Sequence, residues 1–344
     1  MRANTLLSLP HMEIVVSGIR PTGVLHLGNY YGAVRNFVRI QEDENYKGYF
    51  FIADYHSLTT HHQPEELSIL VKQSIATYLA CGLDPERVSL YLQSDLPQIP
   101  ELYLILNMIA YKGELEKVVT FKEKIKVHKE NINAGLLTYP VLMAADILIH
   151  RANKVPVGKD QEQHLEMTRN FAKRFNSKYN SEFFPEPMAY NFEEQLTKVP
   201  GLDGSTKMSK TGSANSAIFM NDTDDDIRKK IMRAKTDGGP SEPFQVMPQE
   251  IINLFDLMKI VSSISTVMHF TDAYNNCSIK YGDMKKQLAE DIIEVVTPIR
   301  KRINELLADE KYLKKVVILG GEAAIVNAEY TIKEVRKLVG LNYF

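Results

Sequence analysis

Short apolar runs alternate with longer amphipathic segments in the first half of the chain. Four of these runs have the length and character of buried strands: residues 13–18, part of 46–59, 88–94 and 155–158. Four other segments have the apolar spacing of helices: residues 64–82, 100–118, 137–153 and 160–176. Strands that alternate with helices form a parallel sheet, so this half is predicted to be an α/β domain.

The pattern changes in the second half of the chain. Residues 222–310 have helical periodicity almost throughout, which predicts a second, all-helical domain. A last helix at 320–340 is predicted to pack back on the first domain. We therefore divide the chain into a disordered extension at 1–11, an α/β domain at 12–215, a helical domain at 216–315 and a C-terminal helical segment at 316–344.

Composition narrows the class of protein. The 344 residues are 44% hydrophobic and 24% charged, which is typical of a soluble globular protein with a packed core. Only two cysteines are present, which excludes a disulfide scaffold and a four-thiolate metal site. Such cysteine usage indicates a reducing compartment, so we expect a cytoplasmic protein. No apolar run reaches the roughly 18 residues that cross a membrane.

Net charge does not point to a nucleic-acid partner. The formal charge is −2, so an RNA would have to meet a local basic surface. The densest basic stretch lies at 227–235 and predicts either such a surface or a solvated helix face. Spacing alone does not decide between the two.

The first motif that indicates chemistry is PTGVLHLGN at 21–29, between a strand and a helix. Helix N-termini carry free N–H groups and attract phosphate. Gly28 has no side chain, which lets a flat base lie against the backbone. His26 and Asn29 share a helix face and are predicted to donate hydrogen bonds to one triphosphate. The alternative is an ordinary strand–turn–helix with a surface histidine, and the motif matches neither a dinucleotide fingerprint nor a P-loop.

The second motif, KMSKT at 207–211, lies in a Gly/Ser-rich loop before the helical half. Lys207 and Lys210 are three residues apart, and a loop that swings can bring both ammonium groups to a leaving pyrophosphate. A solvated flexible linker is the alternative for such a pair taken alone. The two motifs together, in this order within one α/β chain, are more specific.

In both motifs the chain resembles the class I aminoacyl-tRNA synthetases, in which HLGN corresponds to the HIGH signature and KMSKT to KMSKS. The tracts between them are similar to tryptophanyl-tRNA synthetases, above all YPVLMAADILIH at 139–150 and VPVGKDQEQHLEMTRNFAKRF at 155–175. The resemblance runs from about residue 13 to the end. It implies a Rossmann-like catalytic domain, a helical anticodon-binding domain and a homodimer. The implied reactants are L-tryptophan, tRNA(Trp) and ATP with its bound Mg²⁺.

No zinc site or iron–sulfur cluster is expected. Some members of the family carry a four-cysteine iron–sulfur site, but the two distant cysteines of this chain cannot form one.

A tryptophan pocket is predicted on one helix. Tyr139, Met143 and Asp146 fall at i, i+4 and i+7, so they share a face. Indole is a large apolar plane with one N–H donor, and a carboxylate at the end of an apolar slot accepts that donor. A helix aspartate bonded to the backbone or to a neighbouring arginine is the alternative for Asp146. The resemblance adds five further pocket positions, of which the two valines have core packing as an alternative: Gly18, His56, Val155, Val157 and Gln161.

An ATP site is implied by the resemblance. Gly158, Lys159 and Asp160 lie where a strand meets a helix and are implied to lie near the ribose and adenine, although Asp160 is also suited to cap the helix. The implied ATP-binding set is Arg20, Pro21, Thr22, Gly28, Asn29, Gly158, Lys159, Asp160, Val199, Lys207, Met208, Ser209, Lys210 and Thr211. The catalytic set is His26, Asn29, Lys124, Lys207 and Lys210.

Three of these assignments leave alternatives open. Lys124 lies in a charged stretch in which Lys122 and Lys126 are equally placed to reach ATP, and which is also typical of a solvated face. Arg20 stands where many relatives have glutamine. Val16 replaces a phenylalanine that some relatives place beside the indole, so part of that wall must come from elsewhere.

The implied reaction has two steps. Tryptophan is activated by ATP to tryptophanyl-adenylate and is then transferred to the 2′-OH of the 3′-terminal ribose of the tRNA. No protein nucleophile is needed, because positioning and charge stabilisation supply the catalysis. A tyrosine-specific synthetase, a small-molecule adenylyltransferase, and a paralogue that binds tryptophan or RNA without charging tRNA are the alternatives.

Overall fold

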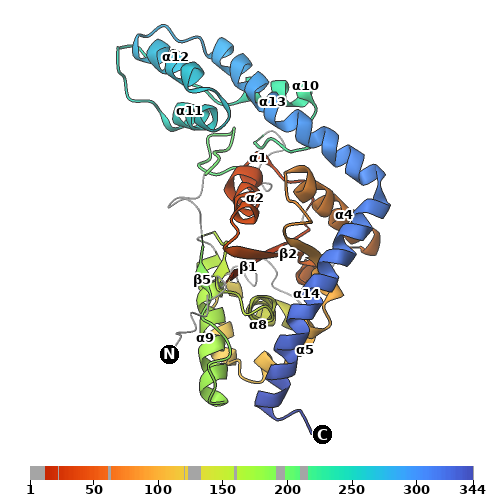
Figure 1. The fold of residues 1–344 in the computed structure, drawn as a ribbon. Coiled ribbons are helices and arrows are strands. Elements are labelled where there is room, and N and C mark those ends of the chain that lie inside the picture. Colours follow the sequence, from red (N-terminus) through yellow and green to blue (C-terminus); the bar gives the residue numbers. More distant parts are fainter. Residues whose placement is uncertain are drawn as a thin grey trace, which may run out of the picture.

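The computed structural model describes residues 12–21, 23–60, 63–119, 121–122, 133–158, 161–190, 198–209 and 216–343. Strands and shorter helices form an α/β part, and a group of helices lies at one end of the molecule (Figure 1). The helices of the α/β part are α1 Leu27–Asn29, α2 Arg35–Glu42, α3 Asp54–Ser57, α4 Pro64–Ala80, α5 Gln98–Asn107, α6 Lys112–Leu115, α8 Ala134–Leu148 and α9 Glu162–Lys178. Those that follow are α10 Asp224–Arg233, α11 Gln249–Val261, α12 Ile264–Asn275, α13 Tyr281–Ala308 and α14 Glu310–Val339.

Five parallel strands form one sheet in the order β3-β2-β1-β4-β5. They are β1 Glu13–Ile19, β2 Tyr46–Ile52, β3 Ser89–Leu92, β4 Lys154–Val155 and β5 Met188–Ala189. The first four lie at the four predicted runs, so the predicted parallel α/β sheet is confirmed. β5 was not predicted because it has only two residues, Met188 and Ala189, which are too few to show a strand pattern and are both exposed.

Both faces of the sheet are buried, which explains why its strands are continuous apolar runs. Alternate side chains enter two separate cores. Val15 and Phe50 pack with α2 and α4 on one face. Val16 and Phe51 pack with α5, α8 and α9 on the other face. The α/β part therefore has three layers, with the sheet in the middle.

The helical part, α10 to α13, is joined to the α/β part mainly by α13. This 28-residue helix packs against α10 and α11 and also against α4 (Figure 1). α10 begins with a capping box, because the side chains of Thr223 and Asp226 each accept a hydrogen bond from the other's backbone N–H. The basic stretch predicted at 227–235 begins in α10 and extends just past its end.

α14 differs from its prediction. A helix was expected at 320–340, but the structure begins it at Glu310 and continues through Gly320 and Gly321. A Cβ atom at Gly320 would lie 2.1 Å from the carbonyl oxygen of Leu90, so glycine lets the helix approach the backbone of β3. Buried residues of α14 before Gly320, such as Leu313, pack in the core that contains α2 and α4. Buried residues after Gly321 pack in the core that contains α5, α8 and α9. α14 therefore passes around β3 and covers this edge strand.

Across the described ranges, no helix has both the length and the apolar character needed to span a bilayer.

Candidate active site

A cavity of about 350 Å³ opens at the carboxyl ends of β1 and β4. β1 pairs with β2 on one side and with β4 on the other, so the strand order reverses here, which is where ligands bind in open α/β sheets. All eight residues predicted for tryptophan line this cavity: Gly18, His56, Tyr139, Met143, Asp146, Val155, Val157 and Gln161. Three of the residues predicted for ATP also line it: Arg20, Asn29 and Gly158. The structure thus brings together positions up to 143 residues apart in sequence, from Gly18 to Gln161.

Asp146 lies on the inner face of α8 with a side chain that is 1% exposed. Its Oδ1 accepts a hydrogen bond from Gln93 Nε2 at 2.7 Å, and its Oδ2 lies 2.8 Å from His56 Nε2. Among the described residues its hydrogen-bond partners are therefore His56 and Gln93, and not the backbone or the arginine of the alternative considered from the sequence. A carboxylate has about four lone-pair sites, so each oxygen can accept one more donor.

Burial raises the pKa of the Asp146 carboxyl, and the hydrogen bonds from His56 and Gln93 oppose that rise. The direction follows from the low dielectric of the site, which disfavours the charged form. A buried charge is tolerated only when it is hydrogen-bonded, and here two donors serve that purpose.

Gln93 was not found from the sequence. It is fully buried directly after β3, where its amide nitrogen holds Asp146 and its amide oxygen lies 3.4 Å from the backbone nitrogen of His56. Its one available signal was its place at the carboxyl end of a buried strand, where ligand-site residues gather in such sheets.

Aromatic and apolar groups form the walls around Asp146. The Tyr139 ring lies 4.4 Å from the His56 ring, centroid to centroid. Phe51 lines the same cavity and supplies an aromatic wall near Val16, where some relatives have phenylalanine. A Cβ atom at Gly18 would lie 2.4 Å from Phe51 Cζ, so glycine is required there for the ring to fit.

In the HLGN turn, His26 and Asn29 cap each other. Asn29 N–H donates to His26 Nδ1 at 3.2 Å, and His26 N–H donates to Asn29 Oδ1 at 3.2 Å. This reciprocal pairing precedes a π-helical turn at Tyr30–Val34 and fixes both side chains in one orientation. His26 itself is 5% exposed.

The two motifs meet at Gly28. A Cβ atom there would lie 2.9 Å from His26 Nδ1 and 3.4 Å from Met208 Cβ. Met208 is buried and its N–H donates to the carbonyl oxygen of Val199 at 2.7 Å. Val199 and Met208 therefore anchor the start of the KMSKT loop, while Lys207 is exposed and Ser209 half-buried.

Arg20 and Pro21 follow β1 at the cavity. Pro21 is buried. Arg20 is half-buried, and its buried Nε atom has no hydrogen-bond partner within the described part of the chain. Lys122 is exposed. The remaining predicted residues lie outside the described ranges: Thr22, Lys124, Lys126, Lys159, Asp160, Lys210 and Thr211. In the described ranges, no group of three or more His, Cys, Asp or Glu side chains is placed to hold a metal ion.

Comparison with known proteins agrees with this architecture. Residues 11–297 match the family model described as tRNA synthetases class I (W and Y). The chain is 56% identical to a tryptophan–tRNA ligase of Porphyromonas gingivalis over 329 residues, which are 96% of this chain and 99% of that one. A tryptophanyl-tRNA synthetase from Campylobacter jejuni, solved with ADP and tryptophan, superposes with a TM-score of 0.84 at 33% identity and covers 95% of this chain and 99% of that one.

A tyrosyl-tRNA synthetase from Aeropyrum pernix shares the fold, with a TM-score of 0.63 at 20% identity over 89% of each chain. The identity to these two tryptophan enzymes, 56% and 33%, is higher than the 20% identity to the tyrosine enzyme, so the chain groups with the tryptophan enzymes. The chain belongs to the class I tRNA synthetases, in the tryptophanyl-tRNA synthetase family.

Proposed function

We propose that this chain activates L-tryptophan with ATP and transfers it to the 2′-OH of the 3′-terminal ribose of tRNA(Trp). One observation carries the proposal. The cavity at the switch point of the sheet joins a buried carboxylate in apolar walls, Asp146, to Arg20 and Asn29 beside the nucleotide-binding turn. One cavity therefore has an indole end and a phosphate end, as the joining of an amino acid to ATP requires.

At the indole end, Asp146 accepts the indole N–H. The support is geometric and chemical: each carboxylate oxygen already has one donor and keeps a lone pair for another. Tyr139, Met143 and Phe51 provide apolar and aromatic surface for the rings. A phenol would present an O–H at the end of a single ring, and the close relatives named for tryptophan do not favour that alternative.

At the phosphate end, the HLGN turn and the KMSKT loop handle the triphosphate. His26 and Asn29 act as donors, Lys207 and Lys210 neutralise the leaving group, and Lys124, Lys159 and Asp160 complete the ATP site. The Nε atom of Arg20 has no partner in the described ranges, which supports a contact with phosphate, since a buried guanidinium donor needs an acceptor. Mg²⁺ arrives bound to ATP.

The chemistry needs no covalent protein intermediate. In the first step a tryptophan carboxylate oxygen bonds to the α-phosphorus, the bond to the bridging oxygen breaks, and pyrophosphate leaves. In the second step the ribose 2′-OH attacks the activated carbonyl carbon and AMP leaves. Catalysis consists of holding the two reactants in line and stabilising charge on the phosphates.

One pair of assays tests this function. Pyrophosphate exchange is measured with tryptophan and with tyrosine in parallel, and charging of total tRNA follows. Exchange with tryptophan alone, followed by charging, is the expected result. Exchange with tyrosine would favour the tyrosine-specific alternative. Exchange without charging would identify an adenylyltransferase, and binding of tryptophan without exchange would identify a paralogue that does not activate it.

The helical part is proposed to meet the tRNA anticodon. Within the basic stretch, Lys229, Arg233 and Lys235 are exposed. Lys230 is half-buried, so it does not belong to that surface. The two free cysteines fit a cytoplasmic site of action, where thiols stay reduced.

A homodimer is proposed from one exposed apolar face. Leu104, Met108 and Tyr111 follow each other at i, i+4 and i+7 along and just beyond α5, and are 57%, 72% and 59% exposed. Apolar faces of this kind mark protein contacts. Sedimentation should give a dimer for the wild type and a monomer for Met108→Glu; a wild-type monomer would contradict the proposal.

A further inference from the structure

The segment 217–222, which follows the KMSKT loop, holds the HLGN turn from outside the cavity. Leu27 N–H donates to the carbonyl oxygen of Ile218 at 2.8 Å, and Met220 N–H donates to that of Leu25 at 2.9 Å. The ring of Phe219 meets the ring of His26 edge-on, 6.3 Å apart. The place of His26 therefore depends on where this segment lies.

Lys230 of α10 fixes the segment by three contacts. Its Nζ donates to Asp222 Oδ2 at 2.6 Å and to the carbonyl oxygen of Ala217 at 3.1 Å, and it lies 4.9 Å from the centroid of the Phe219 ring. Asp222 Oδ2 also accepts the Phe219 N–H at 2.8 Å. The side chains of Lys230 and Asp222 are each 12% exposed, so solvent screens this ion pair far less than a surface pair.

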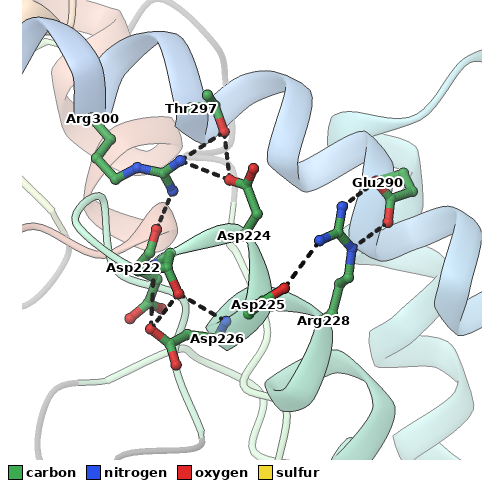
Figure 2. Close-up of polar contacts among 9 residues, drawn as sticks. Asp222, Asp224, Asp225, Asp226, Arg228, Glu290, Thr297 and Arg300 are labelled. Carbon is green, nitrogen blue, oxygen red and sulfur yellow. Dashed lines mark hydrogen bonds and ion pairs between the residues drawn. The ribbon is translucent and has the colours of Figure 1, made fainter.

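Two residues of α13, Arg300 and Thr297, bind Asp222 and Asp224 from the helical part. Arg300 donates to the carbonyl oxygen of Asp222 and, at 2.7 Å, to Asp224 Oδ1. Thr297 Oγ1 donates to Asp224 Oδ1 at 2.8 Å, as Figure 2 shows. The arginine holds the pKa of the Asp224 carboxyl below its usual value, with Thr297 adding to the effect. The contacts thus run without a break from α13 through Asp222 to Phe219 and His26.

We propose that Lys230 and Asp222 are positioning residues for the HLGN turn, and that Arg300 sets their place from α13. This inference rests on the proposed function, because it takes His26 as a group that acts on the triphosphate. Neither Lys230 nor Asp222 lines the cavity, so both act through the turn. The helical part then contributes to adenylate formation itself, in addition to its role toward tRNA.

A positioning role predicts a particular kinetic pattern. Displacing catalytic groups by about 1 Å can cost as much as 10²-fold in rate while ground-state binding elsewhere is unchanged. The proposed tryptophan site lies among α8, β1 and β4, which Lys230 and Asp222 do not contact in the described residues. Loss of the Lys230–Asp222 pair should therefore lower kcat and leave tryptophan binding unchanged.

Arg228 supplies a matched control. It joins α10 to α13, through Nε at 2.7 Å and Nη2 at 3.0 Å from the carboxylate of Glu290 (Figure 2). It lies on the same helix, but none of its described contacts reaches segment 217–222. Lys230→Met and Arg228→Met each remove one positive charge from α10 and keep an unbranched side chain. Only the first removes a contact with segment 217–222.

The experiment measures tryptophan-dependent pyrophosphate exchange, tryptophan affinity by calorimetry and thermal unfolding. Pyrophosphate exchange needs no tRNA, so a variant that has lost contacts with tRNA is not slowed in this assay for that reason. Lys230→Met should lower kcat roughly 10- to 100-fold with tryptophan affinity unchanged. Lys230→Arg should recover most of the rate, and Arg228→Met should keep it. Asp222→Asn, which weakens the pair and keeps its shape, should give a smaller loss of the same kind.

The results separate the two proposals. A wild-type rate in Lys230→Met, or an equal loss of rate in Arg228→Met, overturns the positioning role. If Lys230→Met does not fold, Asp222→Asn decides, and a wild-type kcat in it overturns the role as well. A wild-type protein without any tryptophan-dependent pyrophosphate exchange would contradict the proposed function, and with it the positioning role.

Discussion

His56 Nε2 lies 2.8 Å from Asp146 Oδ2, and both side chains are buried. The Nδ1 atom of His56 is buried and has no hydrogen-bond partner among the residues that the structure describes. A buried N–H without an acceptor would cost more than a bare acceptor, so we assign the ring proton to Nε2. His56 is then the donor of this hydrogen bond, and Asp146 faces the cavity as an acceptor, the role that an indole N–H requires.

Asp146→Ala should weaken tryptophan binding. Loss of a hydrogen bond to a charged group costs about 1.5–3 kcal/mol, or roughly 10- to 100-fold in affinity. Asp146→Asn, which keeps one acceptor oxygen, should lose less. Calorimetry with tryptophan is the measurement, and unchanged affinity in Asp146→Ala would remove the residue from the indole site.

Gln93→Met should also weaken tryptophan binding, although Gln93 does not line the cavity. The substitution removes the donor to Asp146 Oδ1, so the carboxylate is less firmly oriented. Gln98→Met is the control: Gln98 is 7% exposed, but it donates to Glu329 instead. Both variants should lose thermal stability, and only Gln93→Met should lose affinity; equal affinities would show that Gln93 is structural.

Lys210→Ala should slow adenylate formation and leave tryptophan affinity nearly unchanged. Removing one donor to a developing charge typically costs about 2.7–4 kcal/mol of barrier, or 10²- to 10³-fold in rate. Lys178→Ala, at the exposed end of α9, serves as the control for loss of a surface charge. Pyrophosphate exchange checks the prediction, and a normal rate in Lys210→Ala would exclude the lysine from the step.

The protein should lose stability as pH falls below about 6.5, in part through His150. Burial lowers the pKa of His150 from 6.5 to about 4. Between these values the unfolded chain binds a proton that the folded chain does not, so the free energy of unfolding falls with pH, by about 2 kcal/mol at pH 5. His150→Gln should flatten the melting temperature between pH 7 and pH 5, whereas His269→Gln, at an exposed position, should not. If the melting temperatures of wild type and His150→Gln fell equally between pH 7 and pH 5, His150 would not contribute to this loss of stability.

Gly320→Ala should destabilise the protein, because the new Cβ would lie 2.1 Å from the carbonyl oxygen of Leu90. Overpacking of this kind typically costs about 1–3 kcal/mol. Gly282→Ala, in the first turn of α13 with nothing within 4 Å of the Cβ position, should instead stabilise by about 0.5–1 kcal/mol. Thermal unfolding of the two variants tests the contrast, and a Gly320→Ala protein as stable as the wild type would show that α14 can move away from β3.

Local spacing was enough to predict the first four strands and the face of α8 that carries Asp146. Periodicity records which residues share a face, and an acidic residue among apolar ones is conspicuous. Gln93 was missed because one polar residue after a buried strand looks like any strand end. That this residue holds Asp146 depends on contacts between positions 53 residues apart, which no local pattern contains.

Lys230 and Gly320 show the same limit. Lys230 lies in a basic stretch that was predicted to be either an RNA-binding surface or a solvated helix face, both of which are exposed. In the structure its side chain is only 12% exposed and pairs with Asp222. The last helix was predicted to begin at Gly320, whereas the structure places Gly320 and Gly321 inside α14. At Gly320 the backbone of β3 leaves no room for a Cβ atom, because such an atom would lie 2.1 Å from the carbonyl oxygen of Leu90.

The path of α14 around β3 has a consequence for biosynthesis. The ribosome makes the sheet strands first and residues 310–339 last. Until that stretch emerges, the nascent chain carries a parallel sheet with a bare edge strand, which is a template for pairing with other chains. The interval between translating β3 and releasing α14 is thus the period of greatest aggregation risk, and chaperone binding during it would protect this one edge.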